Sequence, residues 1–127
     1  MHGTKNTPTC VYTVSWPPST NDLWRAVKGR NILSRRARLW TEAASLELIA
    51  QGIERIIGPV HVRVELNSPW KRPYDPDNRI KALLDLLVKN SILEDDKDSI
   101  IHRLEIVTRG FEATFTGARV TIEGLSP

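Results

Sequence analysis

The feature that most constrains the fold is a strict alternation of apolar and polar residues over positions 60–66. The apolar members are Val60, Val62, Val64 and Leu66, and the residues between them are polar or charged. A period of two is typical of a β-strand, in which successive side chains point to opposite faces. Such a strand is stable when its apolar face packs on a core, so the chain is predicted to contain a sheet covered on at least one face.

Other patterns predict the remaining elements. Residues 10–16 alternate like a strand, and Ser34 is a suitable N-cap for a helix over 35–51, with Gly52 at its expected end. Apolar residues at helical spacing predict a second helix from about 77 to 90, followed by strands over 100–108 and 119–123. This order predicts an α/β (α+β) fold, with a single mixed β-sheet of about four strands packed by two main helices.

Length and composition limit the class of protein. With 127 residues, the chain is expected to form one domain, with residues 1–9 as a flexible tail. The sequence lacks an apolar run long enough to cross a membrane and a recognisable secretory signal, so a cytoplasmic location is expected. The single cysteine, Cys10, has no partner for an internal disulfide or a zinc cluster.

The charges are segregated along the chain. Between residues 23 and 41 there are six basic residues and no acidic residue before Glu42, namely Arg25, Lys28, Arg30, Arg35, Arg36 and Arg38. Acidic residues gather between Asp75 and Asp98 instead. This distribution favours a protein that binds phosphates with one region and a metal with another, although a solvated helix face and an acidic loop would produce the same pattern.

Two carboxylates and a lysine stand at the start of the second predicted helix. Asp75 and Asp77 are two residues apart, and Lys81 follows Asp77 by one helical turn. Mg²⁺ prefers oxygen ligands and often takes one or two protein carboxylates, and a third acid from residues 94–96 could complete the site. Each feature also has a simpler explanation, because Asp77 could cap the helix or form an ordinary pair with Lys81.

A basic and aromatic loop precedes these acids. It contributes Trp70, Lys71, Arg72 and Tyr74, which are candidates for contacts with phosphates and with unpaired bases. The acidic segment does not fit an EF-hand, because the sixth position counted from Asp75 is Ile80 rather than glycine. The sequence contains no phosphate-binding glycine loop and no recognisable nucleophile motif, so no organic cofactor is expected.

Taken together, these motifs resemble the RusA family of Holliday-junction resolvases over nearly the whole chain. The resemblance rests on the segments W-P-P-S-T-N at 16–21, Gly29-Arg30, D-P-D-N-R-I-K at 75–81 and L-E-D-D at 93–96. It implies that Asp75, Asp77 and Asp96 bind the catalytic metal, with Asp95 as the alternative to Asp96, and that Lys81 is essential. It also implies a homodimer that acts on four-way DNA junctions in bacteria and their phages.

The sequence therefore favours a Mg²⁺-dependent endonuclease, with Mn²⁺ as a possible substitute, that resolves four-way junctions by paired nicks. Two alternatives stay open. A restriction-like nuclease would use Asp77, Asp95 and Lys97. A non-catalytic phage or bacterial DNA-binding regulator would use only the basic half of the chain, with the acidic loop serving to cap and solvate.

Overall fold

The computed structural model describes residues 8–108 and 114–125. Its main sheet contains four strands, which are β1 (Thr9–Val14), β4 (Val60–Asn67), β5 (Ile101–Thr108) and β6 (Gly117–Gly124). Their order across the sheet is β1-β6-β4-β5, in which β4 and β5 are parallel and the other neighbours are antiparallel. The predicted mixed sheet of about four strands is confirmed. The expected tail over residues 1–9 extends too far, because Thr9 already belongs to β1 and pairs with Glu123. Residues 1–7 lie outside the described parts.

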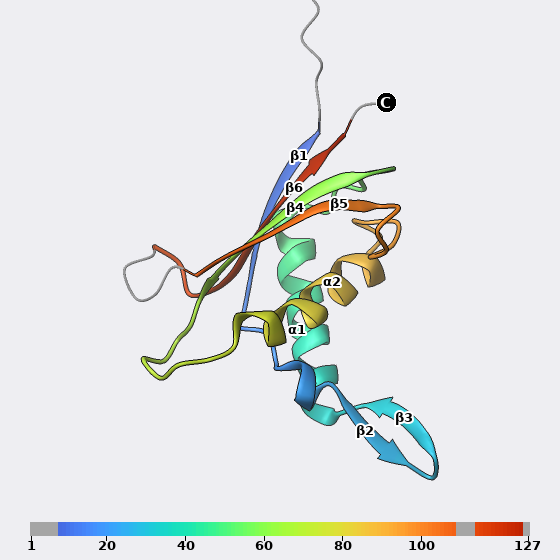
Figure 1. Cartoon of the computed structure of the whole chain (residues 1–127), viewed down its shortest axis with the longest axis vertical. Helices are drawn as coiled ribbons and strands as arrows, with labels where there is room; N and C mark the ends of the chain where they lie inside the picture. Colours follow the sequence, from blue (N-terminus) through green and yellow to red (C-terminus); the bar gives the residue numbers. More distant parts are fainter. Residues whose placement is uncertain (1–7, 109–113, 126–127) are drawn as a thin grey trace, which may run out of the picture.

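Two helices, α1 (Arg35–Gln51) and α2 (Ile80–Lys89), lie on one side of this sheet (Figure 1). The N-cap prediction for α1 is confirmed, since the Ser34 hydroxyl accepts a hydrogen bond of 3.1 Å from the backbone N–H of Ala37. Helix α2 starts three residues later than predicted, because residues Pro76–Arg79 form a 3₁₀ turn, η2. Neither helix, nor any other in the described parts of the chain, is long and apolar enough to cross a membrane.

The core lies between the sheet and the two helices. The apolar side chains of β4 are at most 1% exposed, as their alternation predicts, and they share one buried cluster with Leu48 of α1 and with Leu83 and Leu87 of α2. The opposite face of the sheet carries charged side chains, among which Arg63 and Glu105 lie 3.6 Å apart. The sheet therefore has one apolar and one charged face, so both helices are confined to one side.

A second, two-stranded sheet was not predicted. It is a hairpin of β2 (Trp24–Val27) and β3 (Arg30–Leu33), which follows a short 3₁₀ turn, η1 (Thr20–Asp22), and projects from the body of the molecule (Figure 1). The two residues at its tip, Lys28 and Gly29, have φ values of 50° and 74°. Positive φ at both positions is typical of the type I′ turn that joins closely paired strands.

Candidate active site

The two candidate carboxylates of residues 75–77 lie on a tight turn that joins the loop after β4 to α2. The carbonyl oxygen of Asp75 accepts a hydrogen bond of 3.1 Å from the Asn78 N–H, and the Asn78 amide donates to the Asp75 carboxylate at 3.4 Å. Pro76 takes the first position of η2, where its fixed φ suits the turn. Asp75 and Asp77 are both exposed, so their oxygens are accessible to a ligand from solvent.

Lys81, in the first turn of α2, lies between two carboxylates. Its Nζ is 3.0 Å from Asp85 Oδ1 and 3.0 Å from Asp96 Oδ2. Hydrogen bonds to Asp85 and then to Asp96 raise the pKa of Lys81, and the hydrogen bond from Lys81 lowers the pKa of Asp96. Both groups are therefore charged at neutral pH. Helical spacing allows an ion pair between Lys81 and Asp77. Within the described residues, however, the ion pairs of Lys81 are with Asp85 and Asp96.

The two neighbouring aspartates of the 91–100 connector have different partners. Asp95 accepts a hydrogen bond of 2.7 Å from the backbone N–H of Asp96, and its other oxygen lies 3.8 Å from Lys97 Nζ. Asp96 instead contacts Lys81. The connector consists of turns and bends, and the Lys97 side chain is 74% exposed. Asp96 is thus the member of the pair that shares a site with Lys81.

The chemistry of these donors fits a divalent cation such as Mg²⁺, which binds carboxylate oxygens and keeps several of its waters. The lowered pKa of Asp96 keeps it in the deprotonated form that binds metal. Over residues 8–108 and 114–125, however, no group of three His, Cys, Asp or Glu side chains is placed to hold a metal ion. Asp75, Asp77 and Asp96 as one set of ligands therefore stays a prediction.

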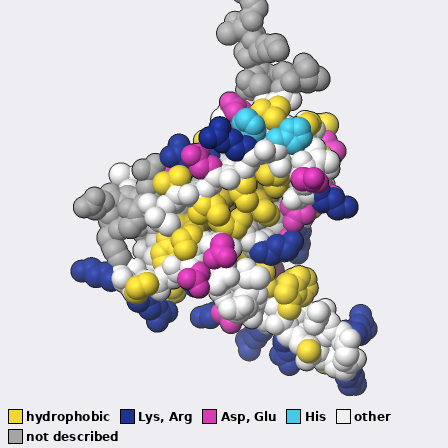
Figure 2. Space-filling model, viewed as in Figure 1, with side chains coloured by type: hydrophobic (Ala, Val, Ile, Leu, Met, Phe, Trp, Pro, Cys, Tyr) yellow, Lys and Arg dark blue, Asp and Glu magenta, His cyan; other side chains and the backbone are white. Residues whose placement is uncertain are grey.

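The basic residues predicted to bind DNA divide between two exposed elements. Arg25, Lys28 and Arg30 belong to the β2–β3 hairpin, and Lys and Arg side chains gather at its projecting end in Figure 2. Arg35, Arg36 and Arg38 are exposed in the first turns of α1. Cations at a helix N-terminus oppose the helix dipole, so helix stability alone does not explain these arginines.

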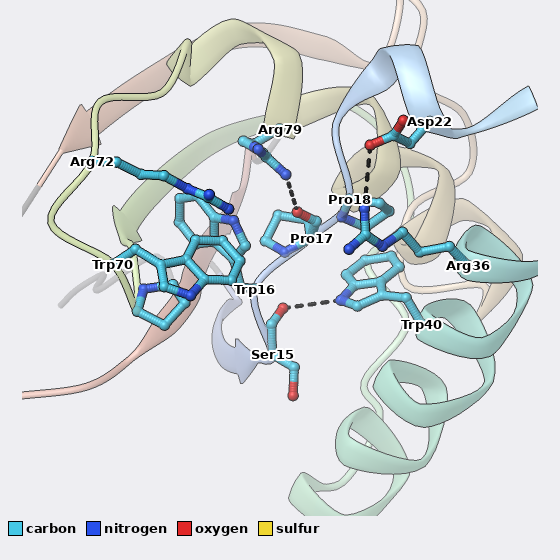
Figure 3. Close-up of a pocket in the computed structure, with 11 residues that line it drawn as sticks. Ser15, Trp16, Pro17, Pro18, Asp22, Arg36, Trp40, Trp70, Arg72 and Arg79 are labelled. Atoms are coloured by element: carbon cyan, nitrogen blue, oxygen red, sulfur yellow. Dashed lines mark hydrogen bonds and ion pairs between the residues drawn. The ribbon is translucent and has the colours of Figure 1, made fainter.

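The predicted basic and aromatic loop contributes to a pocket (Figure 3). Trp70 is 46% exposed, and the Arg72 guanidinium lies 4.7 Å from the centre of its ring. Lys71 is exposed, whereas Tyr74 is half-buried, with its ring edge-on to Trp16 at 4.8 Å between centroids. Burial raises the pKa of Tyr74. Trp70 and Arg72 are therefore open to a ligand, whereas the Tyr74 ring is part of the packing.

Sequence reasoning overlooked several residues of this region. Asp85 contacts Lys81, and the sequence signal for this pair is the i,i+4 spacing of the two residues, which Asp77 and Lys81 share. Arg79 donates a hydrogen bond of 2.8 Å from Nη1 to the Pro17 carbonyl and lies 5.2 Å from the Trp16 ring. No local pattern predicts this contact, because the two partners are 62 residues apart in the chain.

Lys81 is paired with two acids, and exposed carboxylates lie on the turn that leads into the same helix. Together with the exposed basic residues of the hairpin and α1, this combination suits chemistry on a phosphodiester. Comparison with known proteins identifies the class. The family model described as "Endodeoxyribonuclease RusA" matches residues 15–123. The chain therefore belongs to the RusA family of endodeoxyribonucleases.

Individual relatives carry a more specific name. A protein of Enterobacteria phage 82 is 33% identical over 72% of this chain and 78% of its own length, and proteins of Escherichia coli K12 and Shigella sonnei strain Ss046 are 32% identical over the same shares. All three are named crossover junction endodeoxyribonuclease RusA.

Proposed function

We propose that this protein is a metal-dependent endonuclease that resolves four-way DNA junctions by paired nicks and acts in the cytoplasm, where the DNA of a bacterial cell lies. The observation that carries the proposal is the contact of 3.0 Å between Lys81 and Asp96, with the exposed Asp75 and Asp77 on the turn that leads into the same helix. The chain covers 78% of the length of these relatives, and their names support the choice of substrate.

The roles of the residues follow from their chemistry. Asp75, Asp77 and Asp96 would hold Mg²⁺, with Mn²⁺ as a substitute, and the bound ion would activate water and stabilise charge on the scissile phosphate. Lys81 supplies a fixed positive charge for the phosphate oxygens in the transition state. Asp85 would keep the Lys81 side chain in place, because it remains a partner of the ammonium when Asp96 binds the metal.

The charged surfaces would hold the arms of the junction. The projecting hairpin carries three exposed cations at and near its tip, and the start of α1 adds three arginines. Neutralising DNA phosphates releases condensed counterions, so this binding should weaken steeply as salt increases. Lys71 and Arg72 lie in the loop just before Asp75 and would contact the DNA strand that lies nearest the acids.

Paired nicks require two sites, whereas the chain has one set of candidate acids, so we propose a two-fold homodimer. Strand β5 offers a surface for it. Leu104 and Ile106 pair with Val62 and Val64 on the core side of the sheet but are 42% and 38% exposed. In Figure 2, hydrophobic side chains gather near the centre of the view. A partner over β5 would cover this edge.

The two alternatives receive less support. A restriction-like site would place its later acid and lysine on a strand, but Asp95 and Lys97 lie in the irregular connector, with Lys97 mostly exposed. A non-catalytic regulator would not require a lysine held by two acids on the helix that follows an exposed carboxylate pair.

The direct test is incubation of the purified protein with synthetic four-way, three-way and linear duplex DNA, with and without Mg²⁺. We expect metal-dependent, paired nicks in the four-way junction and little cleavage of linear duplex. Binding that depends on salt without cleavage in any divalent metal would favour the regulator instead. Asp77→Asn should abolish cleavage and leave metal-free junction binding intact, and retained cleavage would remove Asp77 from the mechanism.

A further inference from the structure

We propose that a pocket beside the candidate active site binds one unstacked nucleotide of the DNA substrate. The pocket, here called the tryptophan pocket, has a volume of about 460 Å³, and its main walls are Trp16, Trp40, Trp70, Arg36, Arg72 and Arg79 (Figure 3). Its volume is within the range of small-molecule sites. The inference rests on the proposed function, which supplies the DNA, and adds a feature that the substrate must present.

The lining of the pocket indicates the class of ligand. Three indole rings offer surfaces for a planar aromatic group, and the lining includes three guanidinium groups but one carboxylate, that of Asp22. That carboxylate lies 3.5 Å from Arg36 and offsets only one of the three cations. A ligand with a planar ring and a negative charge suits such a lining, and a nucleotide combines the two.

The inner walls of the pocket are fixed before any ligand binds. The Trp40 indole N–H donates to the Ser15 carbonyl at 3.0 Å, and Arg79 donates to the Pro17 carbonyl at 2.8 Å. These bonds tie the start of α1 and the η2 turn to the segment after β1. At the open side, Trp70 is 46% exposed, and the Arg72 guanidinium lies 4.7 Å from the centre of its ring. A base could stack on this indole with its phosphate against the Arg72 guanidinium.

Two buried donors of the pocket residues have no partner among the described residues. They are the indole Nε1 of Trp16 and the Nε of Arg79. A buried donor without an acceptor costs free energy, so a ligand that supplies acceptors is favoured here. A nucleobase presents carbonyl oxygens and ring nitrogens, which are the kind of acceptor that these donors lack. An apolar ligand would leave both donors unpaired.

The position of the pocket connects it to the chemistry. Trp70 and Arg72 lie in the loop that ends at Asp75, and Arg79 lies in the same turn as Asp77. A nucleotide held there would fix the adjoining phosphate near the acids. Uniform duplex keeps its bases stacked and paired, whereas a branch point can release one at lower cost. The pocket would therefore select branched DNA over linear duplex.

The test is a double-mutant cycle between protein and DNA, measured as metal-free binding. Trp70→Ala should weaken binding of an intact four-way junction by roughly 5- to 150-fold, the range of one lost base stack. Removing the base at each branch-point nucleotide in turn should weaken wild-type binding at one position by a similar factor. At that position the two changes should not add, because both remove the same contact. Trp70→Phe, which keeps a ring, should restore most of the affinity.

Trp24→Ala is the matched control, because Trp24 is 49% exposed but lies on the hairpin outside the pocket. With this variant the loss caused by base removal should be as large as in the wild type. Additive losses for Trp70→Ala at every position, or unchanged binding by this variant, would overturn the pocket assignment. The same wild-type preparation is assayed for junction cleavage with Mg²⁺. Cleavage without the predicted coupling defeats only the pocket, whereas absence of cleavage defeats the proposed function.

Discussion

At the scale of single residues, the environment of Lys81 would determine how the proposed site works. Its ammonium lies 3.0 Å from carboxylates that come from two segments, Asp85 on the same helix and Asp96 on the connector that follows it. One ion pair on an exposed helix contributes little, but two acids restrict the position of the charge. A preorganised charge is what stabilises a transition state, because it needs no reorientation during the reaction.

Replacing Lys81 with alanine should therefore lower the rate of junction cleavage by about 10²- to 10³-fold, which is the usual effect of removing one preorganised electrostatic group. Single-turnover assays with saturating protein would measure the chemical step. Lys97→Ala is the control, because Lys97 is exposed on the connector and pairs with Asp95 instead. If Lys97→Ala slowed cleavage as much and Lys81→Ala did not, the restriction-like site would be the correct one.

The pKa of Asp96 provides a second prediction at this scale. The hydrogen bond from Lys81 lowers this pKa in the folded protein, so Lys81→Met should raise it. Because the folded pKa is lower than the unfolded one, the contact stabilises the fold above the unfolded pKa, and the stabilisation is lost as pH falls through the folded pKa.

Carboxyl-carbon NMR titration of both proteins without metal would measure the change. The neighbouring Asp95 serves as the internal comparison, because it pairs with Lys97 rather than with Lys81. An Asp96 pKa that is the same in both proteins would show that Lys81 does not contact this carboxylate in solution.

At the scale of elements, the β2–β3 hairpin places cations away from the body of the molecule (Figure 1). If it contacts phosphates, the double variant Arg25→Ala/Arg30→Ala should reduce the slope of log affinity against log salt by about 1 to 2, since each phosphate contact in duplex DNA contributes about 0.9. Metal-free junction binding at several salt concentrations would measure this slope.

The control removes the same charge elsewhere. Arg55 and Arg103 are exposed, and neither lies on the hairpin or on α1. Arg55→Ala/Arg103→Ala should leave the slope close to that of the wild type. An equal reduction by both double variants would mean that net charge, rather than the hairpin, determines the salt dependence.

The elements also show which parts of the structure the sequence could predict. The alternation of β4 and the apolar spacing of α2 are strong because each has one face in the core. The hairpin could not be predicted because its strands have four residues each and most of these are exposed. Strands without a buried face do not need the alternation of apolar and polar residues that marks β4. Its only local signal was Gly29 in the two-residue turn.

The candidate site also combines a part that the sequence could predict with a part that it could not. Asp75, Asp77 and Lys81 are close in sequence and could be grouped from their spacing, and the family motif added Asp96. The contact between Lys81 and Asp96 depends on how the connector folds back beside α2, and the tryptophan pocket joins residues as distant as Pro17 and Arg79. Contacts of this kind depend on tertiary packing, which no local period encodes.

At the scale of the whole molecule, the proposed paired nicking would depend on how two copies assemble. Leu104 is 42% exposed on the uncovered edge of the sheet, so Leu104→Glu can keep the fold while placing a charge in the proposed interface. We expect this variant to be monomeric at concentrations where the wild type is dimeric, as measured by sedimentation equilibrium. Leu46→Glu, at an apolar residue of α1 that is 67% exposed, is the control and should remain dimeric. The reverse result would move the interface to α1.

Mixed dimers then connect assembly to activity. A dimer with one wild-type subunit and one Asp77→Asn subunit has a single complete site, so it should nick one strand of a junction and release few resolved duplexes. Gel analysis of junctions in a closed cruciform plasmid distinguishes the products, because one nick relaxes the circle and two opposed nicks linearise it. Linear product at the wild-type rate from such mixed dimers would contradict the assignment of one acid set to each nick, because the remaining site would then have cut both strands.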